Sequence, residues 1–567
     1  MTRPDRLPGA LFVLLGASLL AGGLRAPWAG ALAGAAVWVL ARLAGPARLD
    51  RTLAFWALWV GWAALSVLFS DQPLKGVYSL SRWVSGAAFF ALCRQAWGER
   101  ERGLWLDALC AAACVLGLGV LLIPNVNYPF TGFMPPYYNY SVFVEAACAA
   151  AVASVLGRPG GPAGARGRAL AAAGVFCLIM VFLARSRGGL IAIAAAGAFS
   201  AWRRGRARWI LAAALAGAGV LALLPRERLD YLLKADQRSS FNRPQIWKAA
   251  LSVVGGNPIL GEGLGNFEQG FLRHNFPARR AANYGFSADH AHSEFLEIMA
   301  EAGIPGLLAL AAALLFCAAP WSAGRARPDL PREAALGALC AMSVQCLVDN
   351  MFHLQGLLFL FLSALAVAGK TPGAEPLPVR PWRTACLAGL ALSLLSWLPN
   401  WILASNWTLF KREQRPERRL ELALESVRLF PADYYWREVL GRCWLQAEPP
   451  RPDLALREFE RAAALHPTNG LYPHLMAELL TENGEGDRAL ALARKAVALE
   501  PNYFAARFMI VEMLAGRGLR DEARRELEEA ERRRGLLRGL STHSAYDDMI
   551  VSFNDNRYEK LKRLVSR

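Results

Sequence analysis

The sequence Asp-His-Ala-His-Ser-Glu-Phe-Leu-Glu-Ile-Met-Ala-Glu-Ala-Gly occupies residues 289–303 and closes the longest polar interval in the apolar N-terminal part of the chain. This interval begins at Pro225, and hydrophobic segments lie on both sides of it. A loop held in this way at a membrane surface can collect ionisable groups that hydrocarbon would reject, so we expect chemistry here. The interval contains four candidate residues: Arg243, His290, His292 and Glu294.

Composition places the chain among membrane proteins that carry a soluble appendage. It has 567 residues, of which 54% are hydrophobic and 19% charged, so at least two domains are expected. The formal net charge is +17, but the basic residues form short clusters between apolar runs, which favours membrane topology over nucleic-acid binding. Of the ten cysteines only Cys443 lies outside the apolar segments, and the spacings indicate neither a disulfide framework nor a metal site.

Apolar runs of about 17–25 residues, long enough to cross a bilayer, recur along the first 404 residues. The run after Arg3 and Arg6 has no small-residue cleavage site before soluble sequence, so it is expected to be a first membrane helix. The predicted fold is all-α, a polytopic membrane helix bundle of about 12 or 13 spans. The candidate spans are 8–23, 26–43, 52–70, 78–97, 104–123, 139–157, 168–184, 187–203, 207–224, 303–320, 333–349, 351–369 and 382–404.

Alternate loops differ sharply in positive charge, which predicts the orientation, because cytoplasmic loops hold an excess of arginine and lysine. The opposite short loops hold only Arg25, Lys75 and the pair Arg185 and Arg187, so the interval 225–302 and the C-terminal part face outward, towards a bacterial periplasm. The loops assigned to the cytoplasm carry Arg42, Arg48 and Arg51; Arg94, Arg100 and Arg102; Arg158, Arg166 and Arg168; Arg203, Arg204, Arg206 and Arg208; Arg325, Arg327 and Arg332; and Lys370, Arg380 and Arg383.

The outward pair Arg185 and Arg187 opposes the orientation rule and so requires a compensating reason. The two residues lie in Phe-Leu-Ala-Arg-Ser-Arg-Gly-Gly-Leu, between two apolar segments with almost no loop. A bound anion is the simplest reason. The alternative is that both side chains extend to lipid headgroups.

Within the polar interval, Pro244 indicates a helix that begins near Arg243, which places this arginine at the positive end of a helix dipole. The glycine-rich stretch 255–267 allows close backbone packing against neighbouring groups or a ligand, but on its own it does not indicate a nucleotide site. A helix is expected from His292 into the following span.

Two of the seven histidines, His290 and His292, lie beside Asp289, Glu294 and Glu297. A catalytic histidine and a hydrogen-bonded structural histidine both fit this pattern. A metal site is the rival interpretation, but His-Ala-His matches zinc spacing poorly, so we expect no metal and no other cofactor.

Two further groups of polar residues interrupt the apolar runs. Each group could line a headgroup pocket, and each could instead satisfy hydrogen bonds between helices. For the second group we favour the structural role. The first group is Asn139, Tyr140 and Glu145, and the second is Asp349, Asn350 and His353.

The last 160 or so residues are charged, alanine-rich and periodic. A period of 34 residues with proline after the second helix is typical of tetratricopeptide repeats, stacked helical hairpins whose concave face usually binds a peptide or protein partner. Residues 413–430 resemble an incomplete leading repeat, and residues 541–567 a closing helix. The recurring positions are Ala455, Ala489 and Ala523; Ala462, Ala496 and Ala530; Leu465 and Leu499; Pro467 and Pro501; and Gly484 and Gly518.

Four segments together resemble the O-antigen ligase and polymerase superfamily. They are Ser-Arg-Gly-Gly (186–189), Arg-Pro-Gln-Ile-Trp (243–247), Asn-Pro-Ile-Leu-Gly-Glu-Gly (257–263) and His-Ser-Glu-Phe-Leu-Glu-Ile-Met-Ala-Glu-Ala-Gly-Ile-Pro-Gly-Leu (292–307). The resemblance covers most of residues 1–405. It implies a GT-C-like transferase module over residues 1–404, followed by a repeat domain over residues 405–567.

The resemblance also implies the roles of individual residues. The arginines that bind the donor diphosphate fall on Arg187 and Arg243, and the essential histidine falls on His292. The family usually has His-Asn where this chain has His292-Ser293, which blurs the choice of acceptor. The remaining substrate-binding candidates are Arg185, His290, Glu294 and Asn139.

The expected activity is transfer of a glycan from undecaprenyl diphosphate to an acceptor hydroxyl at the periplasmic face of the bacterial inner membrane. The favoured reaction is O-antigen ligation to the lipid A core in lipopolysaccharide biosynthesis, by a metal-independent inverting glycosyltransferase. The alternatives are a polysaccharide polymerase or a protein O-oligosaccharyltransferase. A lipid-linked glycan transporter and a noncatalytic scaffold are weaker alternatives, since a transporter would place its charges at mid-membrane.

Overall fold

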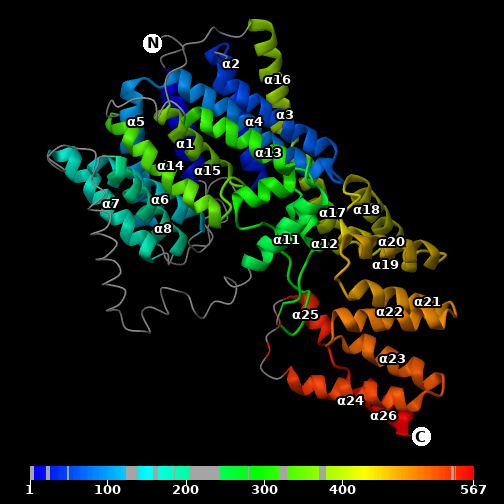
Figure 1. Ribbon diagram of the computed structural model, residues 1–567. Coiled ribbons are helices and arrows are strands. Elements are labelled where there is room, and N and C mark those ends of the chain that lie inside the picture. The colour runs from blue at the N-terminus through cyan, green and yellow to red at the C-terminus, as the bar shows by residue number, and fades with distance from the viewer. Residues whose placement is uncertain are drawn as a thin grey trace, which may run out of the picture. The chain divides into compact units, whose positions relative to one another are not determined.

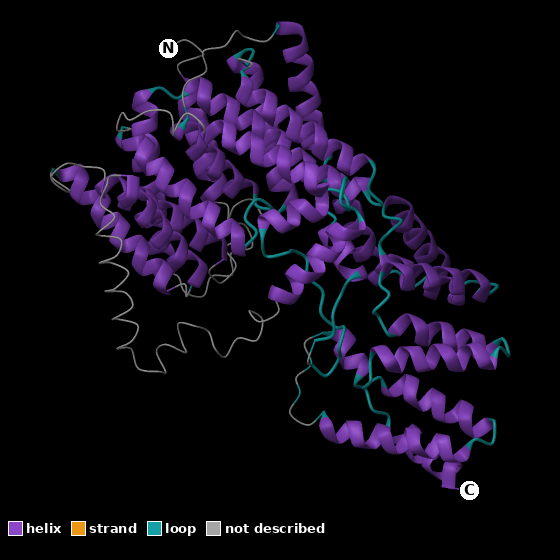
Figure 2. Ribbon diagram, viewed as in Figure 1, coloured by secondary structure: helices purple, strands orange, loops and turns teal. Residues whose placement is uncertain are grey.

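A computed structural model describes most of the chain, and every regular element in the described part is a helix (Figure 2). The all-α prediction is therefore confirmed for these residues. The described residues are 6–20, 26–47, 50–122, 138–156, 164–183, 186–203, 243–278, 280–318, 329–369, 378–537, 540, 542 and 544–566.

The chain divides into two compact units. The first, here called the membrane unit, consists of Met1–Trp247, Asn257–Gly265 and His290–Leu398. The second, here called the repeat unit, consists of Lys248–Gly256, Asn266–Asp289 and Pro399–Arg567. The polar interval is thus shared, because parts of it fold with each unit.

The helices that lie in the membrane unit overlap every predicted span that the structure describes, while the predicted span 207–224 lies outside the described residues. Helix α11 (Arg243–Gly256) starts in this unit and ends in the repeat unit. The other helices are α1 (Leu7–Leu20), α2 (Pro27–Ala44), α3 (Arg51–Leu68), α4 (Pro73–Ala96), α5 (Glu99–Leu122), α6 (Tyr138–Leu156), α7 (Ala165–Leu183), α8 (Arg187–Arg203), α13 (Glu294–Ala318), α14 (Leu330–Val348), α15 (Gln355–Ala368) and α16 (Val379–Leu395).

Six of the described helices are long and apolar enough to cross a bilayer by length and composition. Large apolar side chains such as Ile179, Leu308 and Leu387 are exposed on this unit, as suits contact with lipid. The six candidate segments are Pro27–Ala44, Arg51–Leu68, Glu99–Gly119, Ala165–Leu183, Glu294–Cys317 and Val379–Arg412.

Helix α14 packs against α6, α8 and α15. Small residues allow its closest approach, because a Cβ atom added at Gly337 would lie 2.6 Å from the Ala153 Cβ and 2.7 Å from the Ala149 carbonyl oxygen on α6. In a membrane the hydrophobic effect does not drive helices together, because lipid tails are as apolar as the helix surfaces. Close van der Waals packing between small residues therefore stabilises the contact.

Helix α13 is broken at Gly303, whose backbone angles are φ 71° and ψ 178°. The glycine-rich loop 257–265 packs against this break. The Glu262 and Gly263 amides donate to the Ala300 and Glu301 carbonyls at 3.0 and 2.9 Å, and the Ile304 amide donates to the Pro258 carbonyl at 2.9 Å. The loop therefore supplies partners for backbone groups that the break removes from the helical pattern.

Helix α3 supplies two further donors to the same break. The Trp62 indole N–H donates to the Ala302 carbonyl at 2.8 Å, and the Ser66 hydroxyl donates to the Glu301 carbonyl at 2.7 Å. The glycines of the loop thus serve backbone packing, which is one of the two uses that the sequence allowed.

The repeat unit is a series of antiparallel helical hairpins, visible from α18 to α24 in Figure 1. Ala455, Ala489 and Ala523 are each fully buried at the same place in successive hairpins, which confirms the 34-residue repeat prediction. The helices are α12 (Phe267–Arg273), α17 (Leu398–Arg412), α18 (Pro416–Leu429), α19 (Tyr434–Gln446), α20 (Pro452–Leu465), α21 (Leu471–Glu482), α22 (Gly486–Leu499), α23 (Phe504–Gly516), α24 (Arg520–Leu536), α25 (Ala545–Ile550) and α26 (Asp555–Ser566).

The ends of the repeat unit differ in detail from the sequence expectation. The last predicted span, 382–404, is divided between α16 and α17, and Pro399 lies in the first turn of α17, where its missing N–H does no harm. Helix α17 contributes Phe410 to the core formed by α18 and α19, so it packs with the predicted leading segment 413–430. The closing segment forms two helices, α25 and α26, rather than one.

Replacement of Gly303 by alanine tests the role of the break in α13. Its backbone conformation is nearly exclusive to glycine, and an added Cβ would collide with the Ile259 carbonyl oxygen. We expect Gly303→Ala to destabilise the protein by about 1–3 kcal/mol. Thermal unfolding in detergent measures this loss, and Gly197→Ala on α8, where a Cβ would meet nothing within 4 Å, is the control. Equal melting temperatures for the two variants would refute the role given to the break.

Candidate active site

Two of the predicted site residues, Arg243 and His292, meet at the C-terminal end of α14. The Arg243 guanidinium donates from Nη1 to the Val348 carbonyl oxygen at 2.6 Å. Helix α11 begins at Arg243, as the sequence predicts. A cation at the C-terminal end of a helix is favourable, because the carbonyl groups there carry the negative end of the helix dipole.

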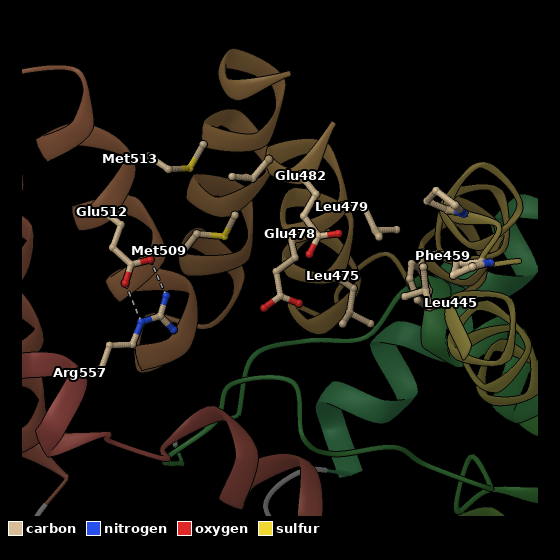
Figure 3. Close-up of a pocket in the computed structure, with 13 residues that line it drawn as sticks. Leu445, Phe459, Leu475, Glu478, Leu479, Glu482, Met509, Glu512, Met513 and Arg557 are labelled. Carbon is tan, nitrogen blue, oxygen red and sulfur yellow. Dashed lines mark hydrogen bonds and ion pairs between the residues drawn. The ribbon is translucent and has the colours of Figure 1, made fainter. Parts of the chain in front are cut away.

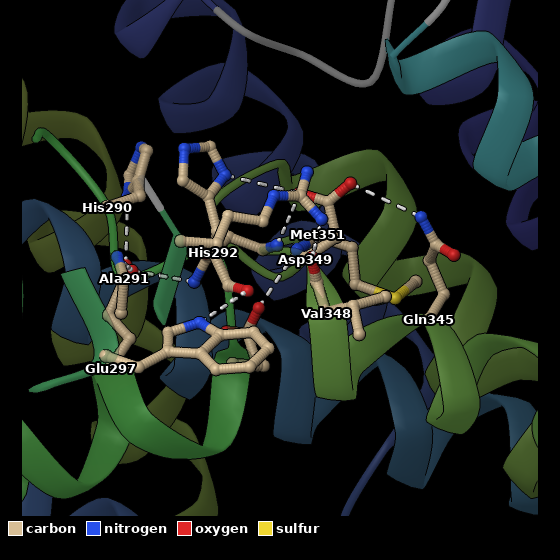
Figure 4. A network of polar contacts seen from close by, with 12 residues as sticks. His290, Ala291, His292, Glu297, Gln345, Val348, Asp349 and Met351 are labelled. Atoms are coloured by element: carbon tan, nitrogen blue, oxygen red, sulfur yellow. Dashed lines mark hydrogen bonds and ion pairs between the residues drawn. The ribbon is translucent and has the colours of Figure 1, made fainter. Parts of the chain in front are cut away.

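His292 lies beside the same helix end (Figure 4). Its ring Nδ1 is 3.8 Å from Asp349 Oδ1, and its side chain is 37% exposed, so the ring remains accessible from outside. The Trp247 indole N–H, which α11 provides, points at the His292 carbonyl oxygen from 3.4 Å. Trp247 on α11 and Asp349, the residue after α14, thus contact His292 from two elements.

The backbone of His292 is strained. Its φ is 50°, and it is the only non-glycine residue with positive φ among the residues that the structure describes. Such a conformation persists only where the surrounding structure enforces it, and it is concentrated at functional sites. The conformation turns the chain just before α13 begins at Glu294.

Asp349 is buried and held by its own neighbours. The Gln345 side-chain amide donates to Oδ2 at 3.3 Å, and the Asn350 backbone amide donates to Oδ1 at 2.9 Å. A carboxylate fixed in this way can set the orientation of a nearby imidazole. The same arrangement limits the freedom of the loop that follows α14.

The start of α8, where Arg187 lies half-buried, is connected to the same cluster. A Cβ added at Gly188 would lie 2.6 Å from Gln345 Oε1, so α8 approaches the residue that holds Asp349. On the other side the Ser186 hydroxyl donates to Glu145 at 2.9 Å and accepts the Gly189 amide at 3.1 Å. Arg187 is therefore next to a fixed turn whose neighbours include Gln345 and Glu145.

His290 belongs to a separate, ionic arrangement. Its Nδ1 is 2.9 Å from Glu297 Oε1, while Glu297 Oε2 accepts the Ala291 amide at 2.8 Å and the Asn350 side chain at 2.6 Å. The ring stacks on His353 with centroids 4.6 Å apart. Burial lowers the pKa of His290, but the charge and hydrogen bond of Glu297 outweigh burial and raise this pKa to about 9. His290 therefore carries its proton at neutral pH and cannot accept another.

Glu294 holds the loop that follows α14. It is buried and accepts the Met351 and Phe352 amides at 2.9 and 3.2 Å. Asp289 is the last residue of a segment that belongs to the repeat unit. Asp349 is the carboxylate whose contact with His292 the structure records.

Two of the predicted substrate-binding residues cannot be placed. Arg185 lies outside the described residues, and Asn139 lies in α6 with its side chain outside the described part. No group of three or more His, Cys, Asp or Glu side chains in the described residues is arranged to hold a metal ion.

The sequence interpretation missed the importance of Asp349, Gln345 and Glu297. The sequence does contain a signal for Asp349, because Asp349 and Asn350 interrupt two apolar runs on the outward side. Asp349 is the C-cap residue of α14, and the Asn350 amide donates to its carboxylate, so hydrogen bonding between these residues is part of what the interruption provides. The contact between Asp349 and His292 joins residues 57 positions apart in the chain, which local spacing cannot reveal.

Comparison with known proteins adds one specific finding. Residues 172–311 match a family model described as O-antigen ligase, and this range contains Arg187, Arg243 and His292. Together with the apolar helices, the match identifies a membrane protein with an O-antigen ligase domain. No curated protein matches the chain.

Several solved structures share stretches of helical arrangement at low similarity. The structure of MamA is 20% identical over 27% of this chain and 92% of its own, with a TM-score of 0.23. The APC/C hetero-tetramer Cut9–Hcn1 is 11% identical over 94% and 87%, with a TM-score of 0.23. Yeast Tom70 is 13% identical over 81% and 96%, with a TM-score of 0.19. Scores of this size carry no conclusion about function.

The ion pair of His290 predicts how stability depends on pH. Its pKa is raised by folding, so the stabilisation is complete below the ordinary imidazole pKa of about 6.5 and is lost as the pH rises through about 9. Between pH 7 and pH 10 the melting temperature of wild type should fall by roughly 2–4 °C more than that of His290→Gln. Differential scanning fluorimetry measures both, with the exposed His274→Gln as control. Parallel curves for wild type and His290→Gln would contradict the ion pair.

Proposed function

We propose that the chain is a glycosyltransferase that moves a glycan from undecaprenyl diphosphate to an acceptor hydroxyl. The observation that carries this proposal is the strained His292, which shares the C-terminal end of α14 with Arg243 inside the range that matches the O-antigen ligase model. A structural histidine needs neither a left-handed backbone nor an accessible ring. The favoured reaction is ligation of O-antigen to the lipid A core.

In the proposed reaction the acceptor oxygen attacks the anomeric carbon of the donor sugar. The bond between that carbon and the diphosphate oxygen breaks, and undecaprenyl diphosphate leaves with the bonding electrons. His292 takes the proton of the acceptor hydroxyl, and Asp349 stabilises the imidazolium that forms. A single displacement of this kind inverts the anomeric configuration.

Arg187 and Arg243 neutralise the charge that develops on the leaving diphosphate. Guanidinium groups bind phosphate oxygens through two parallel hydrogen bonds and stay charged at every physiological pH, so they can do the work of a metal ion. The proposed enzyme is accordingly metal-independent. Arg185, Asn139, His290 and Glu294 remain candidate substrate contacts.

The proposed site faces the periplasm from the inner membrane, as the distribution of positive charge predicts. Residues 1–404 act as the transferase module and residues 405–567 as the repeat module. Polymerisation of glycan repeats and transfer to a protein hydroxyl would use the same donor chemistry, so only the identity of the acceptor separates them from ligation.

The repeat module has a groove that suits a protein partner (Figure 3). The groove has a volume of about 760 Å³. Three glutamates, Glu478, Glu482 and Glu512, line it together with apolar side chains, and Glu512 forms an ion pair with Arg557 at 2.7 Å. A partner segment with apolar and basic side chains would complement this lining. Its apolar lining includes Leu445, Phe459, Leu475, Leu479, Met509 and Met513.

Replacement of the two arginines tests the proposed diphosphate contacts. Arg187→Ala and Arg243→Ala should each lower glycan transfer by roughly 100- to 1,000-fold, and lysine should rescue poorly because it cannot form the two-pronged contact. The measurement is transfer from a lipid-linked donor in liposomes. Lys248→Ala, which removes an exposed cation on the helix that starts at Arg243, is the control. Wild-type donor binding and turnover in both alanine variants would remove these arginines from the site.

Replacement of His292 tests the general base. His292→Ala and His292→Gln should lower single-turnover transfer by roughly 100- to 10,000-fold while donor binding survives, whereas His290→Ala should cost less. The wild-type rate should fall at acidic pH, because a protonated imidazole cannot accept the acceptor's proton. The assay compares single-turnover rates from pH 5 to pH 9. A His292→Gln variant with the wild-type rate and pH profile would exclude the role.

A further inference from the structure

The segment Asn266–Asp289 folds with the repeats, although in the chain it connects the glycine-rich loop with His290. It enters the repeat unit through α12, where the Gln269 side chain donates to the Ala432 carbonyl between α18 and α19. It leaves the unit immediately before His290. The chain therefore reaches the candidate active site directly from a segment that the repeats hold.

Glu500 is the centre of the contact between this segment and the repeats. It follows α22 and is fully buried, and its two carboxylate oxygens accept the backbone amides of Asn283 and Tyr284 at 2.6 and 2.7 Å. The Tyr546 hydroxyl donates to the same carboxylate at 3.2 Å. A buried carboxylate that accepts two consecutive backbone amides fixes the segment in one register.

Neighbouring contacts reinforce the same register. The Asn283 side chain donates to the Leu499 carbonyl at 3.0 Å, and the Asn502 side chain donates to the Ala281 carbonyl at 2.8 Å. Ala282 is buried in an apolar cluster that includes Tyr503. Gly285 lies so close to the Asp547 carboxylate, on α25, that an added Cβ would collide with it. A specific surface on the repeats therefore binds residues 281–285.

We propose that this surface is a built-in positioning device for the transferase site, with Glu500 as its positioning residue. The proposal rests on the transferase function proposed above. His290 lies only six positions after Tyr284, and a stretch of this length spans at most about 20 Å when extended. The surface therefore limits where the chain can begin its turn through His292.

The strained backbone of His292 makes its conformation sensitive to where the preceding chain is held. A positive φ at a histidine persists only when its surroundings enforce it. Contacts of Trp247 and Asp349 act on His292 from the membrane unit, while the segment 281–285 fixes the chain that arrives at it. Release of the segment would let the backbone relax and would move the ring away from its working position, which costs rate more than affinity for the donor.

Hydrogen–deuterium exchange of the full chain in detergent tests the contact itself. In Glu500→Gln the amide NH₂ replaces one carboxylate oxygen and faces one of the two backbone N–H donors. The amides of residues 281–285 should then exchange at least about tenfold faster than in wild type. The exposed Glu460→Gln on α20 is the matched control and should leave their exchange unchanged.

Transfer kinetics on the same proteins test the positioning role. Glu500→Gln should lower kcat by about 10- to 100-fold with the KM for the lipid-linked donor unchanged. A second pair of variants disturbs the same contact by steric collision and leaves Glu500 unchanged. Gly285→Ala should lower kcat in the same way, and adding Asp547→Ala should restore it, because the second change removes the atoms with which the new Cβ collides.

The outcomes separate this proposal from the proposed function. Unchanged exchange of residues 281–285 in Glu500→Gln, or faster exchange with wild-type kcat, overturns the positioning role. Failure of Asp547→Ala to rescue Gly285→Ala also contradicts it. A wild-type protein that transfers no glycan overturns the function and the positioning role together, and the exchange comparison then still decides whether Glu500 holds the segment.

Discussion

Backbone groups at helix ends need hydrogen-bond partners, and inside an apolar helix bundle water cannot supply them. This constraint decides where the polar residues of the membrane unit gather. The break in α13 at Gly303 is satisfied by the glycine-rich loop and by Trp62 and Ser66. The end of α14 is satisfied at Val348 by Arg243, and the loop that follows it is held by Glu294. Arg243, which completes the end of α14, therefore lies at the same helix end as His292.

The fold could be predicted from the sequence where the signal is periodic. The apolar runs and the 34-residue repeat each report on packing that recurs along the chain, and both predictions are confirmed in the described residues. The division of the polar interval between two units could not be predicted, since Glu500 binds Asn283 and Tyr284 across more than 200 positions. The same applies to the partner of His292, because Asp349 lies 57 positions further along the chain, directly after α14. Spacing predicts which residues lie together on one element, but not which elements meet.

The arrangement also explains why two histidines only two residues apart differ in chemistry. His290 forms an ion pair with Glu297 and keeps its proton, whereas His292 faces Asp349 from 3.8 Å with an accessible ring. His290 is thereby bound to the first turn of α13, whereas His292 is the residue that we propose as the general base. The repeat unit adds a further constraint on this turn, because it binds the chain shortly before His290.

The proposed activity is transfer of a glycan from a lipid-linked donor to an acceptor by the membrane unit. The most direct measurement is to reconstitute the purified chain in liposomes with a defined undecaprenyl-diphosphate glycan and an acceptor, and to analyse both products. The account predicts free undecaprenyl diphosphate and glycosylated acceptor in equal amounts, with the anomeric configuration inverted. Movement of intact donor across the bilayer without cleavage, or a product with retained configuration, would contradict it.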